Sequence, residues 1–497
     1  MIEKMYKGLL RIFSILSVLI SLSFYSCNQE TTPELLTKDN LFIFTSELAS
    51  SEYEGRLAGS EGYNKAAALT AEKFKSFGLE PLGDSAFFQF FNIEYNKINH
   101  LSFSNLTNND SIIHYEAGKD FVARGFSGSG DIEAPVVFCG YGISRPGKGY
   151  DDYANIDVED KIVMIFKEKP RWKLDNENIG HNSLRKKAKV AESKGAKGII
   201  YISFPNAEEP QKPIGSVKHG KGNHLKDMPQ IHVANHVANQ IARESRTDLK
   251  KLQSYIDGNK QPKSKPLETI AHIFIDADYQ KKKRTMNVVG MLEGTDDSLK
   301  NEYVVLGAHL DHVGNQGGKV LFPGANDNAS GAASITAVAD ALSREKDSIK
   351  RSVIVVAFSS EEQGLQGATH FVKNSPVDRD HIVAMLNMDC VAHGDSIVLG
   401  SGRTSPELYK MARKTDSVNK KLVIDRTWGG GGADATPFYK KGVPTLYFAT
   451  KNSYTHLHLP TDTPETLNQD LHYEITKLAY KLTKEISQGK YDGEKNE

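Results

Sequence analysis

The fold class is decided by one stretch, Tyr303-Val304-Val305-Leu306-Gly307-Ala308-His309-Leu310-Asp311, in which an apolar run ends in polar residues. A short apolar run of this kind is typical of a strand that is buried on both faces of a sheet. Similar runs recur at 352–359, 382–388 and 445–448, and helix-length segments separate them. This alternation predicts the α/β class, with a mainly parallel mixed sheet sandwiched by helices.

The same reasoning predicts further elements on either side of this stretch. Strands are expected at 286–292 and 396–399 and, in the middle of the chain, at 134–140, 161–167, 198–204 and 230–233. Helices are expected at 62–78, 183–194, 330–343, 366–373, 406–416 and 470–486. The lysine- and glycine-rich stretch 207–227 is interpreted as a solvated loop, and 258–266 as a linker.

Composition excludes several classes of protein. The chain has 497 residues, with 62 basic and 62 acidic side chains, so it is neither a globally basic nucleic-acid binder nor a protein with a polyacidic tail. Three cysteines are too few for a disulfide framework or a thiolate zinc ribbon. The basic helix expected at 183–194 has no interleaved aromatic residues, so we interpret it as a solvated face and expect no nucleic-acid partner.

The N-terminus has the pattern of a targeting segment. Lys4, Lys7 and Arg11 precede an apolar run from 12 to 24, and Ser26 then precedes Cys27. This arrangement resembles a bacterial lipoprotein signal, which implies a signal peptide at 1–26, a lipid on Cys27 and a tether at 27–40. An ordinary signal peptide or an anchor helix is the alternative. The resemblance places the chain in the bacterial cell envelope, periplasmic or at the cell surface, and attached to the membrane by its lipid.

Cleavage of residues 1–26 changes the charge and the cysteine count of the mature chain. It removes three basic residues and one acidic residue, which leaves a net charge of −2. Cys139 and Cys390 both lie in apolar runs, so two buried free thiols are expected.

Polar residues follow the predicted strands at the points where the strands end. In open α/β sheets the crevice beyond the carboxyl ends of the strands is where ligands bind. The clusters delivered to that edge are His309 with Asp311, Asp327, Glu361 with Glu362, Asp389, and the segment that contains His456 and His458.

These side chains form a donor set of imidazole and carboxylate, without sulfur. Such a set suits zinc, and also manganese or cobalt. Two histidines and three carboxylates exceed the three protein ligands of one catalytic zinc, but they fit two metals that share a bridging carboxylate, about 3.5–4 Å apart. The spare acid Glu361, next to Glu362, can act as general base. The residues therefore predict a dinuclear metal hydrolase and leave open which bond it cleaves.

Several motifs in this order resemble the co-catalytic dinuclear zinc aminopeptidase family. That family includes leucyl aminopeptidases and, more distantly, glutamate carboxypeptidase II and the transferrin receptor. The motifs are Gly307–His312, Gly324–Gly331, Ser360–Gly367, Asn387–Asp389 and His458–Thr463, with Glu54–Ser60 and Phe77–Pro81 towards the N-terminus. The middle region resembles an inserted protease-associated domain. The resemblance implies a zinc exopeptidase fold, with a discontinuous catalytic domain at 41–100 and 267–490 and a smaller β-rich α/β insertion at 101–266.

The resemblance also implies two zinc ions per chain and a role for each site residue. One zinc is assigned to His309 and Asp389, the other to Glu362 and His458, and Asp327 bridges both. Glu361 is assigned as the catalytic base, and Asp311 as the residue that orients His309 through its second ring nitrogen. A cis peptide bond is implied between Asp327 and Asn328.

The substrate pocket departs from the family pattern. Many relatives have Ser-Asp-His where this chain reads Ala433-Asp434-Ala435. Asp434, Tyr454 and His456 are the candidate pocket residues, and the segment from Trp428 to Gly432 is a candidate pocket wall. The remaining candidates near the motifs, His312, His370, His381 and His393, are interpreted as structural or exposed.

The expected function is an aminopeptidase that removes N-terminal residues from peptides. A carboxypeptidase is an alternative, for which Arg403 and Arg426 are candidate partners of a substrate carboxylate. A glutaminyl cyclase is another, although that enzyme uses a single zinc. A non-catalytic binding module on the same scaffold is the third alternative, and the complete set of ligands and base argues against it.

Overall fold

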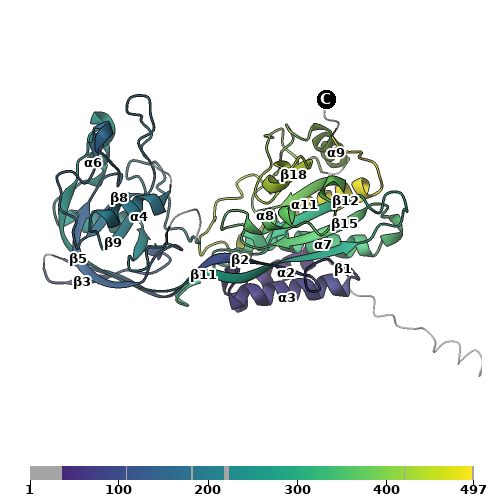
Figure 1. Ribbon diagram of the computed structural model, residues 1–497, viewed down its shortest axis with the longest axis horizontal. Coiled ribbons are helices and arrows are strands. Elements are labelled where there is room, and N and C mark those ends of the chain that lie inside the picture. The colour runs from purple at the N-terminus through teal and green to yellow at the C-terminus, as the bar shows by residue number, and fades with distance from the viewer. Residues whose placement is uncertain (1–35, 108, 181–182, 218–222, 419, 495–497) are drawn as a thin grey trace, which may run out of the picture. The chain divides into compact units, whose positions relative to one another are not determined.

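The protein is described by a computed structural model that covers residues 36–494 except 108, 181–182, 218–222 and 419 (Figure 1). The expected signal peptide, Cys27 and most of the tether lie outside these residues. The end of the tether differs from expectation, because helix α2 (Lys38–Leu48) already begins at Lys38. The backbone amide of Asn40 donates to Thr37 Oγ1 at 3.2 Å, which caps the helix.

Strand β12 (Tyr303–His309) is central to the part of the sheet that carries the predicted ligands. It runs parallel to β15 (Ser352–Phe358) and β16 (Ile382–Met388), and β16 runs parallel to β18 (Thr445–Thr450). The edge strand β17 (Ile397–Gly400) is antiparallel to β18. The mainly parallel mixed sheet is therefore confirmed, with these strands within two residues of their predicted ends.

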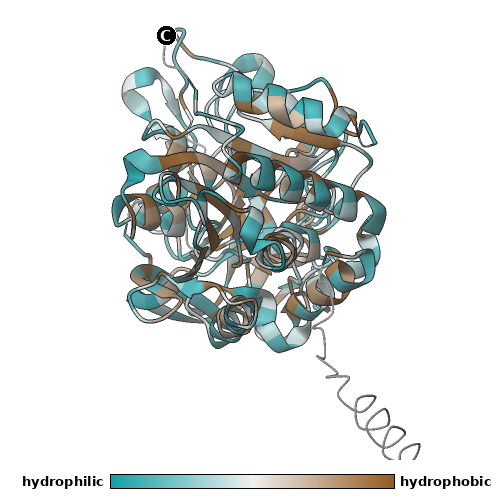
Figure 2. Cartoon of the chain, turned by 90° about the vertical axis from the view of Figure 1, so that its right-hand side faces the viewer, coloured by the Kyte–Doolittle hydropathy of each residue, from teal (hydrophilic) through white to brown (hydrophobic). Residues whose placement is uncertain are grey.

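Helices cover both faces of this part of the sheet (Figures 1 and 2). One face packs against α2, α3 (Glu61–Ser76), α7 (Ser330–Ser343) and α11 (Gln469–Ser487), and α9 (Pro406–Ser417) packs beside α11. The other face packs against α8 (Gln366–Lys373) and α10 (Ala435–Tyr439). In β15, Val353 and Val355 enter the first cluster and Ile354 and Val356 the second, which explains the continuous apolar run in the sequence.

Two long strands were not foreseen. Strand β11 (Lys265–Leu292) was expected only from 286, and its antiparallel partner β2 (Phe88–Leu106) was not expected. The polar run Lys281-Lys282-Lys283 interrupts the apolar pattern of β11, but the ladder with β2 satisfies the backbone on both sides of it. The strand β1 (Glu80–Pro81) also pairs with β11. The expected domain limits at 100 and 267 fall inside these two continuous strands.

The middle of the chain forms a second group of parallel strands, which joins β11 along its first part, from Lys265 to Ile275. Strands β5 (Gly130–Phe138), β8 (Ile162–Phe166), β9 (Gly198–Ile202) and β10 (Gln230–Val233) follow one another, and the short β4 (Phe121–Ala123) completes the path. The predicted helix near 183 is α4 (Leu184–Ser193), whereas α5 (Asn235–Arg243) and α6 (Leu249–Asn259) were missed. Short strands β3 (Ile112–His114), β6 (Ser144–Arg145), β7 (Tyr150–Asp151), β13 (Asn315–Gln316) and β14 (Val320–Leu321) form local pairs.

The stretch expected to be a solvated loop, 207–227, is partly buried. Pro213, Gly215 and Val217 are buried. Val217 packs in a cluster with Leu57 and Phe322, which lie in segments next to the predicted ligand loops. The loop is therefore anchored at this point to the segments next to the predicted ligand loops.

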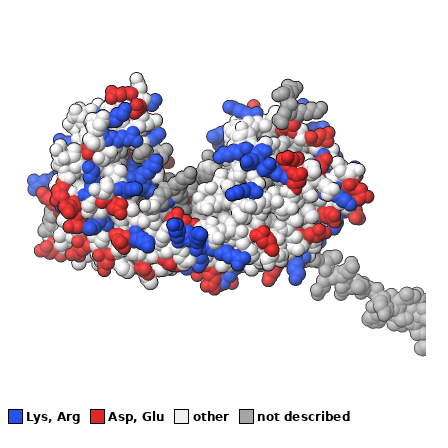
Figure 3. Space-filling view, viewed as in Figure 1, with Lys and Arg blue, Asp and Glu red and all other residues white. Residues whose placement is uncertain are grey.

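Cys139 and Cys390 are free and buried, which confirms the expectation of two buried thiols. Acidic and basic side chains are interspersed over the face shown in Figure 3, in keeping with the balanced composition. Among the described residues, no helix combines the length and the apolar character needed to cross a membrane.

Candidate metal centre

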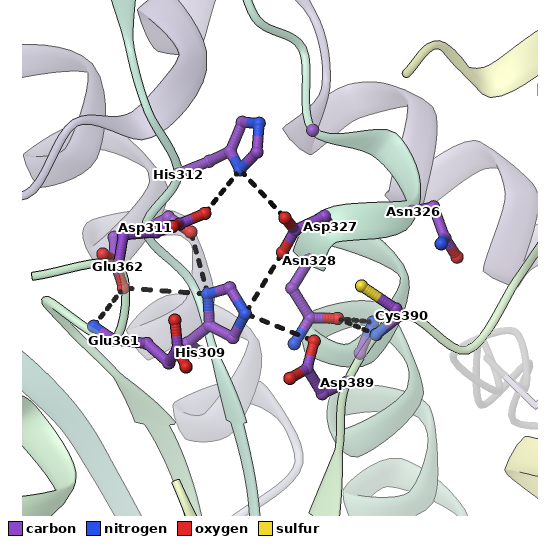
Figure 4. Close-up of polar contacts among 12 residues, drawn as sticks. His309, Asp311, His312, Asn326, Asp327, Asn328, Glu361, Glu362, Asp389 and Cys390 are labelled. Atoms are coloured by element: carbon purple, nitrogen blue, oxygen red, sulfur yellow. Dashed lines mark hydrogen bonds and ion pairs between the residues drawn. The ribbon is translucent and has the colours of Figure 1, made fainter. Parts of the chain in front are cut away.

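The carboxyl ends of three adjacent strands deliver most of the predicted ligands to one place (Figure 4). His309 is the last residue of β12, and Asp389 directly follows β16. Glu361 and Glu362 follow β15 after Ser360, whose φ of 57° turns the chain back towards the sheet edge. Asp327 lies in the turn before α7, and its peptide bond to Asn328 is cis, as predicted.

A first group of candidate ligands consists of His309, Asp327 and Asp389, all buried. His309 Nε2 lies 3.3 Å from Asp327 Oδ1 and 3.4 Å from Asp389 Oδ1 (Figure 4). Around a tetrahedral ion with bonds of about 2.0–2.2 Å, neighbouring ligand atoms lie roughly 3.3–3.6 Å apart. The distances from His309 to the two carboxylates therefore match the spacing of ligands around one zinc ion.

A second group contains Asp327 again, together with Glu362, His458 and His312. His458 Nε2 lies 3.3 Å from Asp327 Oδ2 and 3.0 Å from Glu362 Oε1. Asp327 thus turns one carboxylate oxygen to each group. A carboxylate shared in this way is what two neighbouring cations need, so the residues present fit a dinuclear site.

The charge balance at this site favours bound cations. Burial opposes charge on His309, yet hydrogen bonds to Asp327 and Asp389 and the nearby carboxylates raise the pKa of His309 well above its usual value. In Glu361, by contrast, burial raises the pKa well above its usual value, and several neighbouring carboxylates act in the same direction. For Glu362 burial acts in the same direction, but the charge of His458 and the hydrogen bonds to the site histidines outweigh it and lower the pKa to about 2. Adjacent glutamates with pKa values pushed apart suit different roles, one as ligand and one as proton carrier.

Asp311 orients His309 differently from the prediction. His309 Nδ1 lies 3.0 Å from the backbone carbonyl oxygen of Asp311, whereas the carboxylate Oδ1 is 3.8 Å away. The carboxylate instead accepts the backbone amide of Glu361 at 3.1 Å. Asp311 therefore fixes the tautomer of His309 through its main chain and the position of the Glu361 loop through its side chain.

His312 was set aside as structural or exposed, and the structure places it in the second group. Its side chain is fully buried, and its Nδ1 lies 3.1 Å from Glu362 Oε1 and 3.7 Å from Asp327 Oδ2 (Figure 4). The available signal was its position directly after Asp311. His370 and His393 are half-buried and His381 is exposed, and these three lie in neither group.

The predicted pocket residues lie in different settings. Asp434 is fully buried, and neither of its carboxylate oxygens has a hydrogen-bond partner among the described residues. Burial raises the pKa of Asp434 well above its usual value. His456 belongs to neither ligand group, and its Nδ1 lies 2.9 Å from Thr461 Oγ1.

Tyr454 connects to the site through a residue that sequence reasoning missed. The Tyr454 side chain is 57% exposed, and its hydroxyl lies 3.1 Å from the hydroxyl of Tyr447. Tyr447 in turn donates to Asp389 Oδ2 at 3.1 Å. The predicted wall residue Trp428 packs against Tyr447, with the centroids of the two rings 5.9 Å apart.

Two buried side chains of opposite charge hold the turn that carries Asp327. Arg56 has no exposed surface, and its guanidinium donates to the carbonyl oxygens of Pro323 and Gly324, each at 2.8 Å, and of Leu310 at 2.9 Å. On the other side, Asp462 accepts the backbone amides of Asn326 at 2.8 Å and Asp327 at 3.0 Å. Arg56 thus ties the His309 loop to the Asp327 turn, and Asp462 ties that turn to the His458 loop.

The middle of the chain also contacts the site. The backbone amide of Gly215 donates to the carbonyl oxygen of His458 at 2.8 Å. His458 has a φ of 54°, so this residue holds an uncommon backbone conformation at the place where the loop contacts it.

The comparison with known families agrees with this geometry. Residues 287–483 match the model of peptidase family M28. Within this M28 region lie the ligand candidates and Glu361. The match supports a zinc-dependent hydrolase.

Individual relatives are distant. An aminopeptidase of Pseudomonas aeruginosa (strain UCBPP-PA14) is 28% identical over 294 residues, which cover 58% of this chain and 47% of that protein. The chain thus spans about half the length of that relative. The solved structure of an aminopeptidase from Aneurinibacillus sp. strain AM-1 superposes with a TM-score of 0.62 at 18% identity, over 90% of this chain and 94% of that one. The solved structure of BSAP, a zinc aminopeptidase from Bacillus subtilis, also superposes with a TM-score of 0.62 at 18% identity, over 92% of this chain and 96% of that one. At these identities the structural likeness establishes the fold.

Proposed function

We propose that this chain is a dinuclear zinc aminopeptidase that hydrolyses N-terminal residues from peptides. The observation that carries the proposal is Asp327, which turns one oxygen to His309 and the other to His458 while Glu361 lies free of both ligand groups. The M28 match and the aminopeptidase names of its relatives support the reaction class.

In this proposal His309 and Asp389 would hold one zinc ion, Glu362 and His458 would hold the other, and Asp327 would serve both. Bound there, the ions supply Lewis acidity towards a water molecule and towards the scissile carbonyl. Glu361 takes the proton of the attacking water and returns it to the leaving amine.

We further propose that the middle region limits access to short, unstructured peptides. The contact between Gly215 and His458 and the burial of Val217 against the catalytic region support this, because they set that loop beside a candidate zinc ligand. Cleavage of intact folded proteins as readily as of dipeptides would contradict this part of the proposal.

The cell-envelope location also stands as a proposal. Its support is the sequence around Cys27, which resembles a lipoprotein signal. Metabolic labelling with a clickable fatty acid tests it: the wild type is expected to be labelled and Cys27→Ala is not.

The experiment that tests the activity is hydrolysis of aminoacyl reporter substrates by the mature chain, with and without a chelator. We expect hydrolysis that the chelator abolishes and added zinc restores. Glu361→Gln keeps the shape of the side chain but removes the base, so its kcat is expected to fall about 10²–10⁴-fold with unchanged zinc content. An inactive zinc-loaded wild type favours a non-catalytic binding module, and full activity of Glu361→Gln contradicts the assigned base.

A further inference from the structure

A cavity of about 230 Å³ lies next to the candidate metal centre, on the edge of the sheet formed by β17 and β18. Val398, Tyr447 and Ala449 line its floor, whereas their strand neighbours Leu446 and Phe448 point into the main core. The loop from Lys451 to Thr455 forms its rim. Ligand sites for drug-sized molecules have about 300–1,000 Å³, so this cavity has room for one side chain.

Tyr447 joins the cavity to the metal centre. Its ring lines the cavity, and its hydroxyl donates to Asp389 Oδ2 at 3.1 Å. Tyr454, also in the lining, contacts the same hydroxyl at 3.1 Å. The cavity therefore begins one side chain away from a candidate zinc ligand, within reach of a substrate whose reacting group lies at the metals.

The charges that line the cavity are all positive. Arg426 and Lys451 both belong to the lining, and no carboxylate does. Among the described residues, neither of these two cations forms an ion pair. Larger cavities beside α9 also contain lysines, but Glu485 lines one of them and Glu407 and Glu494 line another.

We propose that this cavity binds a carboxylate of the substrate, that of an N-terminal aspartate or glutamate side chain. The inference rests on the proposed peptidase function and names its substrate class. Arg426 and Lys451 supply charge-assisted hydrogen bonds to the carboxylate, and the rings of Trp428 and Tyr447 pack against the methylene groups. The same chemistry fits the terminal carboxylate of a dipeptide, so the experiment must separate these two sources.

The test compares kcat/KM values of the zinc-loaded wild type with those of Arg426→Gln/Lys451→Gln. The ratio of kcat/KM for glutamyl and leucyl anilides measures the contribution of the side-chain carboxylate, since an anilide has no free C-terminus. The ratio of kcat/KM for alanyl-alanine and its amide measures the contribution of the terminal carboxylate. The matched control is Lys440→Gln/Lys441→Gln, which removes two exposed lysines outside the cavity. Circular dichroism checks that both double variants are folded.

We expect the glutamyl-to-leucyl ratio to fall about tenfold in Arg426→Gln/Lys451→Gln and to stay constant in the control. A fall in the preference for alanyl-alanine over its amide, at a constant glutamyl-to-leucyl ratio, identifies the terminal carboxylate as the source. The proposal is overturned if both ratios match the wild type.

A separate binding measurement keeps this inference distinct from the catalytic proposal. If the zinc-loaded wild type hydrolyses none of these substrates, the proposed function fails, and calorimetric titration with glutamate and glutamine then tests the cavity alone. Tighter binding of glutamate that the cavity variant loses supports the site. Equal binding of the two amino acids, or none, overturns it.

Discussion

Buried charges in the M28 region and in the middle region of the chain are satisfied in different ways. In the middle region, Asp152 accepts two backbone amides and the hydroxyl of Tyr150, and the buried Lys187 donates to the carbonyl oxygens of Phe166 and Glu168. At the metal centre, both oxygens of Asp434 and one oxygen of Asp311 have no partner among the described residues.

This difference indicates two roles for buried charge: in the middle region it stabilises the fold, and at the metal centre it binds a ligand. Unpaired buried charges are costly, and the cost is offset only when a partner arrives. Asp152 and Lys187 have their partners within the middle region, so we expect these two charges to affect stability alone. The metal centre gathers carboxylates into two groups of candidate ligands, so we expect its charges to affect metal binding and catalysis.

The largest effect is expected where the two ligand groups meet. Asp327→Asn keeps the shape of the side chain but removes the shared negative charge, and both groups lose a ligand at once. Reporter hydrolysis is expected to fall at least about 10³-fold, as when a group essential to the chemistry is removed. Steady-state kinetics measures the loss. Activity within tenfold of the wild type would show that Asp327 does not bridge two functional ions.

A smaller effect is expected from a matched pair of carboxylates, one in each region, whose replacement distinguishes a change in zinc affinity from a change in stability. Asp462 and Asp152 are both buried, and each accepts two backbone amides. The two amides at Asp462 bind different carboxylate oxygens, so an asparagine there can accept only one of them and its NH₂ group faces the other donor. At Asp152 both amides bind Oδ2, so an asparagine there keeps them only when its NH₂ group takes the place of Oδ1 beside the Tyr150 hydroxyl. Asp462→Asn displaces the Asp327 turn, so zinc affinity is expected to weaken about 10–100-fold.

Asp152→Asn is the control for that comparison. It is expected to lower the free energy of unfolding and to leave zinc affinity unchanged, since its partners Tyr141 and Ile143 lie in the middle region. Competition with a zinc-binding dye measures both affinities. Equal weakening by the two variants would remove the distinction between the regions.

The smallest effect on activity is expected from Lys187→Met. This variant tests instead whether the buried charge of the middle region changes the stability of the fold with pH. Burial lowers the pKa of Lys187 from 10.5 to about 7. Between pH 7 and 10.5 the unfolded chain therefore binds more protons at this residue than the folded chain, so the wild type gains stability as the pH rises. The methionine variant lacks this gain, which for one proton is at most about 1.4 kcal/mol per pH unit.

Urea unfolding at pH 7.5 and 9.5 measures this difference. The stability of the wild type relative to Lys187→Met is expected to rise between the two values, while reporter hydrolysis by the variant stays close to that of the wild type. A relative stability that is constant or falls with pH would contradict the assigned pKa.

The sequence predicts the strands of the M28 region well because they are buried on both faces and read as continuous apolar runs. It predicts the positions of His309, Asp327, Glu361, Glu362 and Asp389 because strand ends and the turn before a helix place them. Strand β11 was largely missed because a ribbon with one exposed face tolerates the lysines at 281–283.

Other parts of the site depend on contacts between distant segments, and local pattern cannot show these. Arg56 lies more than 250 residues from Leu310 and Pro323, whose carbonyl oxygens it binds. The hydrogen bond between Tyr447 and Asp389 likewise depends on the pairing of β18 with β16. His312 has a local signal, but only the fold shows that its ring turns towards Glu362 rather than to solvent.

The most direct test of the account is the zinc content of the purified mature chain, determined by inductively coupled plasma mass spectrometry after dialysis against buffer with trace zinc. We expect two zinc ions per chain in the wild type and less than one in Asp327→Asn, because both sites share that carboxylate. One ion or none in the wild type, or two ions retained by Asp327→Asn, would contradict it.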